Sequence, residues 1–160
     1  MKKIVLSSFT ALLLLIVLAT ATLAAPTAGE RELLLKGYIP AAETQQGAPP
    51  TIHVSLNGSG NATQLGLFTY TMQAELTVPA LSATNSATFV AADGSSLSAA
   101  GTGQGTPTGT PGVISIVETL TITGGTGRFE GASGNITIRR HVNRATFESS
   151  GTIEGLIILL

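Results

Sequence analysis

Apolar and polar residues alternate strictly over several stretches of this chain, and this two-residue period is that of a β-strand with one buried face. The longest run extends from Phe68 to Val78, with apolar side chains on one face and Thr, Gln and Glu on the other. Shorter runs alternate in the same way at Thr51–Leu56, Val113–Thr123 and Asn135–Val142. No stretch beyond the N-terminal segment has a convincing helical period, so the pattern predicts an all-β protein.

Turn residues and prolines mark the ends of further strands. We predict a first strand over Leu33–Ile39, which Pro40 ends because proline cannot donate a backbone hydrogen bond. The dipeptide Asp93-Gly94 is typical of a type I′ hairpin turn, and it separates the predicted strands Ser86–Ala92 and Ser95–Ala100.

One or two strands, Ala145–Ser149 and Thr152–Leu159, close the chain around a bend at Ser150-Gly151. About eight strands joined by Gly-rich turns are typical of an antiparallel barrel or sandwich. We predict a single antiparallel eight-stranded β-barrel, whose interior is either filled by side chains or holds one small ligand. A membrane barrel is the competing architecture, but only 4% of residues are aromatic and the C-terminal LIILL lacks the aromatic girdle of such barrels.

Three segments have the composition of turns or loops. Ala41–Pro50 (AAETQQGAPP) is predicted to be a mobile loop, and Asn57–Asn61 (NGSGN) a turn. Gly101–Gly112 contains little besides Gly, Thr and Pro and is predicted to be a flexible loop.

A connection with five glycines joins the last two alternating runs. If the centre of this connection is Phe129, the two runs pair so that Ile122 faces Ile136. The same register puts Glu118 opposite Arg140, two opposite charges on an otherwise apolar face.

Glu118, Arg140 and Tyr70 are therefore the candidate ligand-binding residues. On an inward face, Glu118 and Arg140 form a buried ion pair, which makes a polar spot in an apolar cavity that Tyr70 also faces. The alternative is a pair near the barrel mouth, partly hydrated and contributing little to stability or function.

The glycine-rich connection is assigned a structural role, because glycine readily adopts the positive φ of tight turns. A phosphate-binding loop would be followed by a helix and would usually contain Lys, whereas a strand follows here and Arg128 is the nearby cation. We predict that Phe129 packs the loop onto the barrel end, with Arg128 and Glu130 facing solvent. The structural loop residues are Gly124, Gly125, Gly127, Phe129, Gly131 and Gly134.

The sequence offers no candidate catalytic residue, cofactor site or metal site. His53 and His141 lie on the polar faces of their strands, with no carboxylate at a fixed spacing. No G-x-S-x-G nucleophile motif is present, and the absence of Cys excludes disulfides and thiol chemistry.

The N-terminus has the pattern of a secretory signal, in which Lys2 and Lys3 precede the apolar run Ala11–Leu18 and the small residues of Ala19–Ala25. We predict a signal peptide over residues 1–24, a barrel domain over residues 25–160 and a secreted or periplasmic location. An uncleaved anchor helix is the alternative, and no stable membrane span is expected after cleavage. Removal of two of the eight basic residues leaves a charge of 6 − 9 = −3, which argues against nucleic acid as a partner.

The segment GGTGRFEGASGN, Gly124–Asn135, resembles the G-G-T-G-x-F-x-G-A-x-G signature of the allene oxide cyclase and dirigent barrels. The segments SGNATQLGLFT and AADGSSL resemble small secreted bacterial proteins of uncharacterised function. The resemblance implies an eight-stranded antiparallel barrel. Dirigent proteins steer phenoxy-radical coupling with charged residues inside the barrel, and Glu118 and Arg140 are of the right type for such a role.

Three functions are open at this stage. The leading hypothesis is a non-enzymatic scaffold that binds a small apolar ligand or a partner surface. The second is a cyclase-like or dirigent-like enzyme or stereochemical guide that acts in the cavity. The third is a structural extracellular protein that forms homo-oligomers through an exposed strand or the apolar tail Leu156–Leu160.

Overall fold

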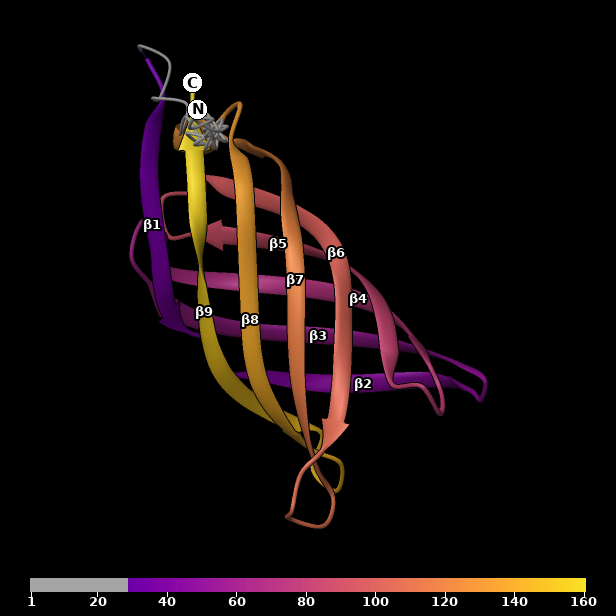
Figure 1. Cartoon of the computed structure of the whole chain (residues 1–160). Helices are drawn as coiled ribbons and strands as arrows, with labels where there is room; N and C mark the ends of the chain where they lie inside the picture. Colours follow the sequence, from indigo (N-terminus) through magenta and orange to yellow (C-terminus); the bar gives the residue numbers. More distant parts are fainter. Residues whose placement is uncertain (1–28) are drawn as a thin grey trace, which may run out of the picture.

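The computed structural model describes residues 29–160, and this part of the chain is built almost entirely of β-strands (Figure 1). The predicted signal peptide lies outside the described residues. Within residues 29–160 there are nine strands and one short 3₁₀ helix: β1 (Arg31–Tyr38), β2 (Ala41–Ala48), β3 (Thr51–Ala62), β4 (Gly66–Thr77), β5 (Ser82–Ala91), β6 (Ser96–Pro107), β7 (Val113–Thr126), η1 (Gly127–Phe129), β8 (Ser133–Asn143) and β9 (Glu148–Leu159). No helix among these residues is long and apolar enough to cross a bilayer.

The strands close into a barrel. Strands β3 to β9 form an antiparallel meander in which each strand is hydrogen-bonded to the next. Strands β1 and β2 together occupy one position between β9 and β3: β1 pairs along its whole length with β9, whereas β2 pairs mainly with β3. The described residues thus form a closed antiparallel barrel with eight strand positions, which confirms the predicted fold class.

The break between β1 and β2 falls at Ile39 and Pro40. The backbone N–H of Ile39 donates to the carbonyl of Gly151 at 2.9 Å, and Pro40 has no N–H with which to continue the ladder. A Cβ at Gly58 would collide with the Pro40 carbonyl oxygen, so glycine lets β3 pass close to this kink. The predicted turn at Asn57–Asn61 is therefore wrong: its glycines allow close backbone approach inside a strand.

Two other predicted loops are also strands. Ala41–Pro50 contains β2, and the prediction of a mobile loop is wrong because its backbone pairs with β3 while Ala41 and Glu43 turn inward. The predicted flexible loop Gly101–Gly112 is a continuation of β6 as far as Pro107, so this prediction is wrong for its first half. Within this part of the strand, Gly101 lies so close to the Thr119 carbonyl oxygen that no side chain would fit.

The C-terminal region forms one strand rather than two. Residues 144–147 form a turn, and β9 then runs through the predicted bend at Ser150-Gly151 without interruption. Gly151 is a close-approach position, because a Cβ there would collide with the Arg139 carbonyl oxygen on β8.

The register of β7 with β8 differs by two residues from the prediction. Thr121 pairs with Asn135, so the hairpin is centred on Arg128, and Glu118 faces Ile138 while Arg140 faces Ile116. The predicted pairing of Glu118 directly opposite Arg140 is therefore wrong, but a shift of two keeps both side chains on the inner face.

Beyond the last residue pair of β7 and β8, the chain contains a bulge and a helical turn. Ser98 of β6 pairs with Gly124 and Ala99 pairs with Ile122, which leaves Thr123 as an extra residue in β7. The chain then reverses through η1 rather than through a symmetric loop.

The inward-facing side chains fill one end of the barrel with aromatic and aliphatic groups. Tyr70 stacks on Phe89 with 5.9 Å between ring centroids, and Phe68 packs edge-on against Phe89 at 6.0 Å. Phe129 of η1 is 1% exposed and belongs to the same buried cluster, as predicted for a residue that packs the loop onto the barrel end. We call this the plugged end.

Candidate functional site

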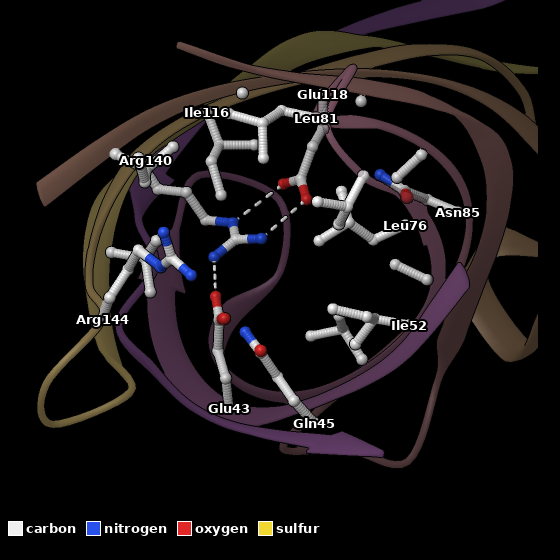
Figure 2. Close-up of a pocket in the computed structure, with 18 of the residues that line it drawn as sticks. Glu43, Gln45, Ile52, Leu76, Leu81, Asn85, Ile116, Glu118, Arg140 and Arg144 are labelled. Atoms are coloured by element: carbon white, nitrogen blue, oxygen red, sulfur yellow. Dashed lines mark hydrogen bonds and ion pairs between the residues drawn. The ribbon is translucent and has the colours of Figure 1, made fainter. Parts of the chain in front are cut away.

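A cavity occupies the barrel interior at the end opposite the plugged end (Figure 2). Its volume is about 190 Å³, and it lies between the first residues of β3, β5 and β7 and the last residues of β4, β6 and β8. Most of its wall is apolar, contributed by Pro49, Ile52, Val54, Ala74, Leu76, Val78, Leu81, Ala83, Ile114, Ile116 and Val142. Six polar or charged side chains interrupt this wall: Glu43, Gln45, Asn85, Glu118, Arg140 and Arg144.

Three of these side chains form a buried ion network, which we call the triad (Figure 2). Arg140 binds Glu118 through two parallel hydrogen bonds: Nε donates to Oε2 at 3.1 Å and Nη2 donates to Oε1 at 3.0 Å. Its Nη1 donates to Oε1 of Glu43. The fractional exposures of Glu118, Arg140 and Glu43 are 2%, 5% and 7%, so the whole network is withdrawn from water.

The electrostatics of the triad keep the guanidinium charged. Burial by itself lowers the pKa of Arg140, but the charges and hydrogen bonds of Glu118 and Glu43 outweigh it and raise the pKa above its ordinary value. One buried cation thus serves two carboxyl groups. The bidentate geometry with Glu118 fixes the plane of the guanidinium against the cavity wall.

Of the three predicted ligand-binding residues, the structure brings two together. Glu118 and Arg140 are joined in the triad, although they are not directly opposite in the strand register. Tyr70 lies deeper, in the aromatic cluster, and is not part of the cavity wall. Its hydroxyl donates to the Pro40 carbonyl oxygen at 3.2 Å, and burial raises the pKa of Tyr70, with Arg140 opposing and Glu118 and Glu43 adding to the shift.

The sequence prediction missed Glu43 and Asn85. Glu43 falls in the segment predicted to be a loop, whose sequence AAETQQ has no alternation of apolar and polar residues. The strand pattern appears only in the structure, where Ala41 and Glu43 are buried and Ala42 and Thr44 are exposed. Asn85 lies before the predicted start of its strand. It is in phase with the inward-facing Ala87 and Phe89, and this phase is the signal that would have found it.

Asn85 differs from the other polar residues of the cavity because it has no partner. It is 5% exposed, and neither its Oδ1 nor its Nδ2 has a hydrogen-bond partner. Figure 2 shows its side chain on the cavity wall near Leu76, and Gly103 of β6 lies between Asn85 and Glu118. Arg144 and Gln45 are exposed residues on the same side as Glu43 and form part of the rim.

The glycine-rich connection lies at the plugged end, away from the cavity. Gly127, Gly131 and Gly134 have φ angles of 61°, 73° and 127°, a conformation that side chains disfavour. A Cβ at Gly125 would collide with the Phe129 carbonyl oxygen, and Gly124 has a φ of 154°. These positions place Phe129 in the core.

Arg128 and Glu130 are exposed, as predicted. The Arg128 guanidinium lies 4.8 Å from the Phe129 ring centroid and forms an ion pair with Asp93 at 3.2 Å. His53 and His141 are on the outer surface, and residues 29–160 contain no group of three or more potential metal ligands in one place.

The comparisons with known proteins identify the fold. No protein-family model matches the chain, and no curated protein matches it. The structure of the pterocarpan synthase dirigent protein GePTS1 is similar, with a TM-score of 0.60 and 16% identity, covering 88% of this chain and 98% of that chain. The structure of the pterocarpan synthase dirigent protein PsPTS1 gives a TM-score of 0.56 and 16% identity, covering 79% of this chain and 94% of that chain.

The fold is therefore a dirigent-like β-barrel, as the resemblance of Gly124–Asn135 to the allene oxide cyclase and dirigent signature predicted. At 16% identity, these likenesses show the fold and not a function. The candidate site of this chain consists of its apolar cavity, the triad and the unpaired Asn85 amide.

Proposed function

We propose that this protein is a non-enzymatic scaffold that takes one small, uncharged and mostly apolar molecule into the open end of its barrel. The observation that carries the proposal is the triad in the wall of an apolar cavity. A barrel selected for stability alone gains little from it, because replacing buried ion pairs with apolar side chains is often neutral or stabilising. The plugged end of the same barrel is filled with apolar side chains.

The triad supplies oriented hydrogen-bond donors. A guanidinium has five N–H groups, and the bonds to Glu118 and Glu43 use three of them. The remaining two are available to a polar group of the ligand. Because Glu118 and Glu43 fix the guanidinium in place, a ligand meets donors that are already ordered.

The cavity volume limits the size of the ligand. An engineered apolar protein cavity of about 150 Å³ binds benzene. At about 190 Å³, this cavity suits one ring with a small substituent rather than a drug-sized molecule. An anionic ligand is disfavoured, because Arg140 is already matched by two carboxyl groups.

A dirigent-like stereochemical guide is the second candidate, and the similarity to two pterocarpan synthase dirigent proteins favours it. Such a guide would hold a reacting molecule in one orientation through the same cavity and triad. Both candidates require the cavity to bind a small molecule, so one binding experiment tests their common basis.

The experiment is a titration by calorimetry with toluene, acetophenone, benzamide and benzoate, on the original protein and on two variants. Ala74→Leu fills the cavity wall, whereas Ala100→Leu makes the same change on the exposed surface of β6. We expect the neutral compounds to bind the original protein and Ala100→Leu, and binding to Ala74→Leu to fall at least about tenfold with no loss of thermal stability. Equal binding by both variants, or no binding by any protein, would refute the proposal.

A further inference from the structure

We propose that Asn85 is the residue that selects the ligand, and that the ligand carries a neutral group with an acceptor and a donor side by side, as in a carboxamide or a lactam. This inference rests on the proposed function of the cavity. It is carried by the unpaired amide of Asn85, which the triad does not explain.

The amide is buried and unpartnered on both of its atoms. Oδ1 and Nδ2 each have less than 1 Å² of exposed surface and no hydrogen-bond partner. Within residues 29–160, the remaining buried side-chain polar atom without a partner is Oγ of Ser149, which lies outside this cavity. Unsatisfied buried polar groups destabilise a fold, and each calls for an explanation.

None of the neighbouring residues forms a hydrogen bond with this amide. On one side lies Gly103, whose missing side chain makes room: a Cβ there would lie 3.0 Å from Nδ2 of Asn85 and 3.2 Å from Cγ of Glu118. Glu118 lies on the other side of Gly103, where Arg140 binds both of its carboxylate oxygens. No hydrogen bond joins Glu118 to Asn85, so the amide lies beside the triad without being part of it.

The chemistry of the side chain specifies its complement. An Asn amide presents one acceptor and two donor hydrogens in one plane, and it forms two parallel bonds with a group that offers a donor beside an acceptor. A carboxamide or lactam provides this donor and acceptor without charge. A carboxylate has no donor, so one of its oxygens would face Oδ1 of Asn85 and repel it. Because both atoms are withdrawn from the surface, contact requires rotation of the Asn85 side chain toward the ligand.

The test compares benzamide with acetophenone, which has the same shape and carbonyl but no N–H donor. We expect the original protein to bind benzamide about ten- to a hundredfold more tightly than acetophenone, since the benzamide N–H can donate to Oδ1 of Asn85, whereas acetophenone leaves this buried acceptor unpaired. This comparison needs no variant. Equal affinities would overturn the assignment of the ligand class while leaving a cavity that binds small neutral rings.

The variant Asn85→Leu provides the second arm. It has nearly the same size without the amide, so we expect an unchanged or higher melting temperature and loss of the preference for benzamide over acetophenone. A preference that persists in this variant would overturn the role of Asn85, as would a fall in melting temperature, which would mark a structural amide. If neither toluene nor benzamide binds the original protein, the proposed function fails and this inference fails with it.

Discussion

Removal of the Arg140 side chain should destabilise the barrel strongly. In the part of the chain that the structure describes, no other cation forms an ion pair with Glu118 or Glu43. The substitution Arg140→Met keeps the aliphatic volume and leaves two buried carboxyl groups without a counter-ion. Loss of one partner of a buried ion pair destabilises by about 3–5 kcal/mol, a large part of the 5–15 kcal/mol or so that holds a typical domain folded.

The assay is urea unfolding followed by circular dichroism, with thermal melts as a second measure. For a domain of this size, the loss corresponds to a fall in melting temperature of roughly 10–20 °C. The matched control is Arg139→Met, one residue earlier on β8. Its side chain is 58% exposed and pairs with Glu154 at 3.4 Å on the outer surface, so the expected loss is below about 1 kcal/mol.

A triple variant separates the loss of a partner from the loss of packing. Glu43→Leu, Glu118→Leu and Arg140→Met together remove every charge of the triad, so most of the stability lost in Arg140→Met should return. The reasoning is refuted if Arg140→Met is no more destabilising than Arg139→Met. It is refuted equally if the triple variant is less stable than Arg140→Met alone.

Two further predictions concern the interior around the triad. Burial raises the pKa of Tyr70 above its unfolded value of 10.0, so its contribution to stability is complete below pH 10 and should decline by roughly 1.4 kcal/mol per pH unit above it. Tyr70→Phe lacks this decline, so the urea midpoints of the original protein and of Tyr70→Phe should converge or cross between pH 8 and pH 11. Tyr38→Phe, which changes an exposed tyrosine, is the control. Gly58→Ala places a Cβ against the Pro40 carbonyl and the Tyr70 ring, so it should destabilise the protein by about 2–4 kcal/mol. Gly109→Ala has open space around it and should change stability by less than about 0.5 kcal/mol. Equal effects of the two substitutions would contradict the close approach of β3 to the kink at Pro40.

Much of the barrel could be predicted from alternation, because the period of two records which side chains share a face. The inward face of β4 follows directly from it. The turn at Asp93-Gly94 was predicted from its residue types, and the predicted type I′ geometry is wrong: Gly94 has a positive φ but Asp93 does not, and the N–H of Gly94 donates to the Ala91 carbonyl. The β7–β8 register does not follow from alternation, since a shift of two residues leaves every face unchanged. The extra residue at Thr123, where β7 pairs with β6, and the turn of η1 are likewise visible only in the tertiary structure.

Part of the candidate site could also be predicted from the sequence, namely Glu118 and Arg140 but not Glu43 or Asn85. Two opposite charges on one apolar face identified Glu118 and Arg140, and the ion pair forms even though the residues are diagonal rather than opposite. Glu43 was missed because its surroundings have the composition of a loop, while barrel closure recruits that segment as half of a strand position. Asn85 shows no local signal beyond its phase in the strand, because whether its amide has a hydrogen-bond partner depends on the residues that fold around it.

The measurement that tests the central claim most directly is an NMR titration of ¹⁵N-labelled protein with benzamide. We predict saturable shifts of backbone amides in the cavity wall, at Ala83, Gly103 and Val142, with the amide of Phe129 at the plugged end unchanged. Shifts confined to the outer surface or to the plugged end, or no shifts at all, would contradict the account of the cavity as the functional site.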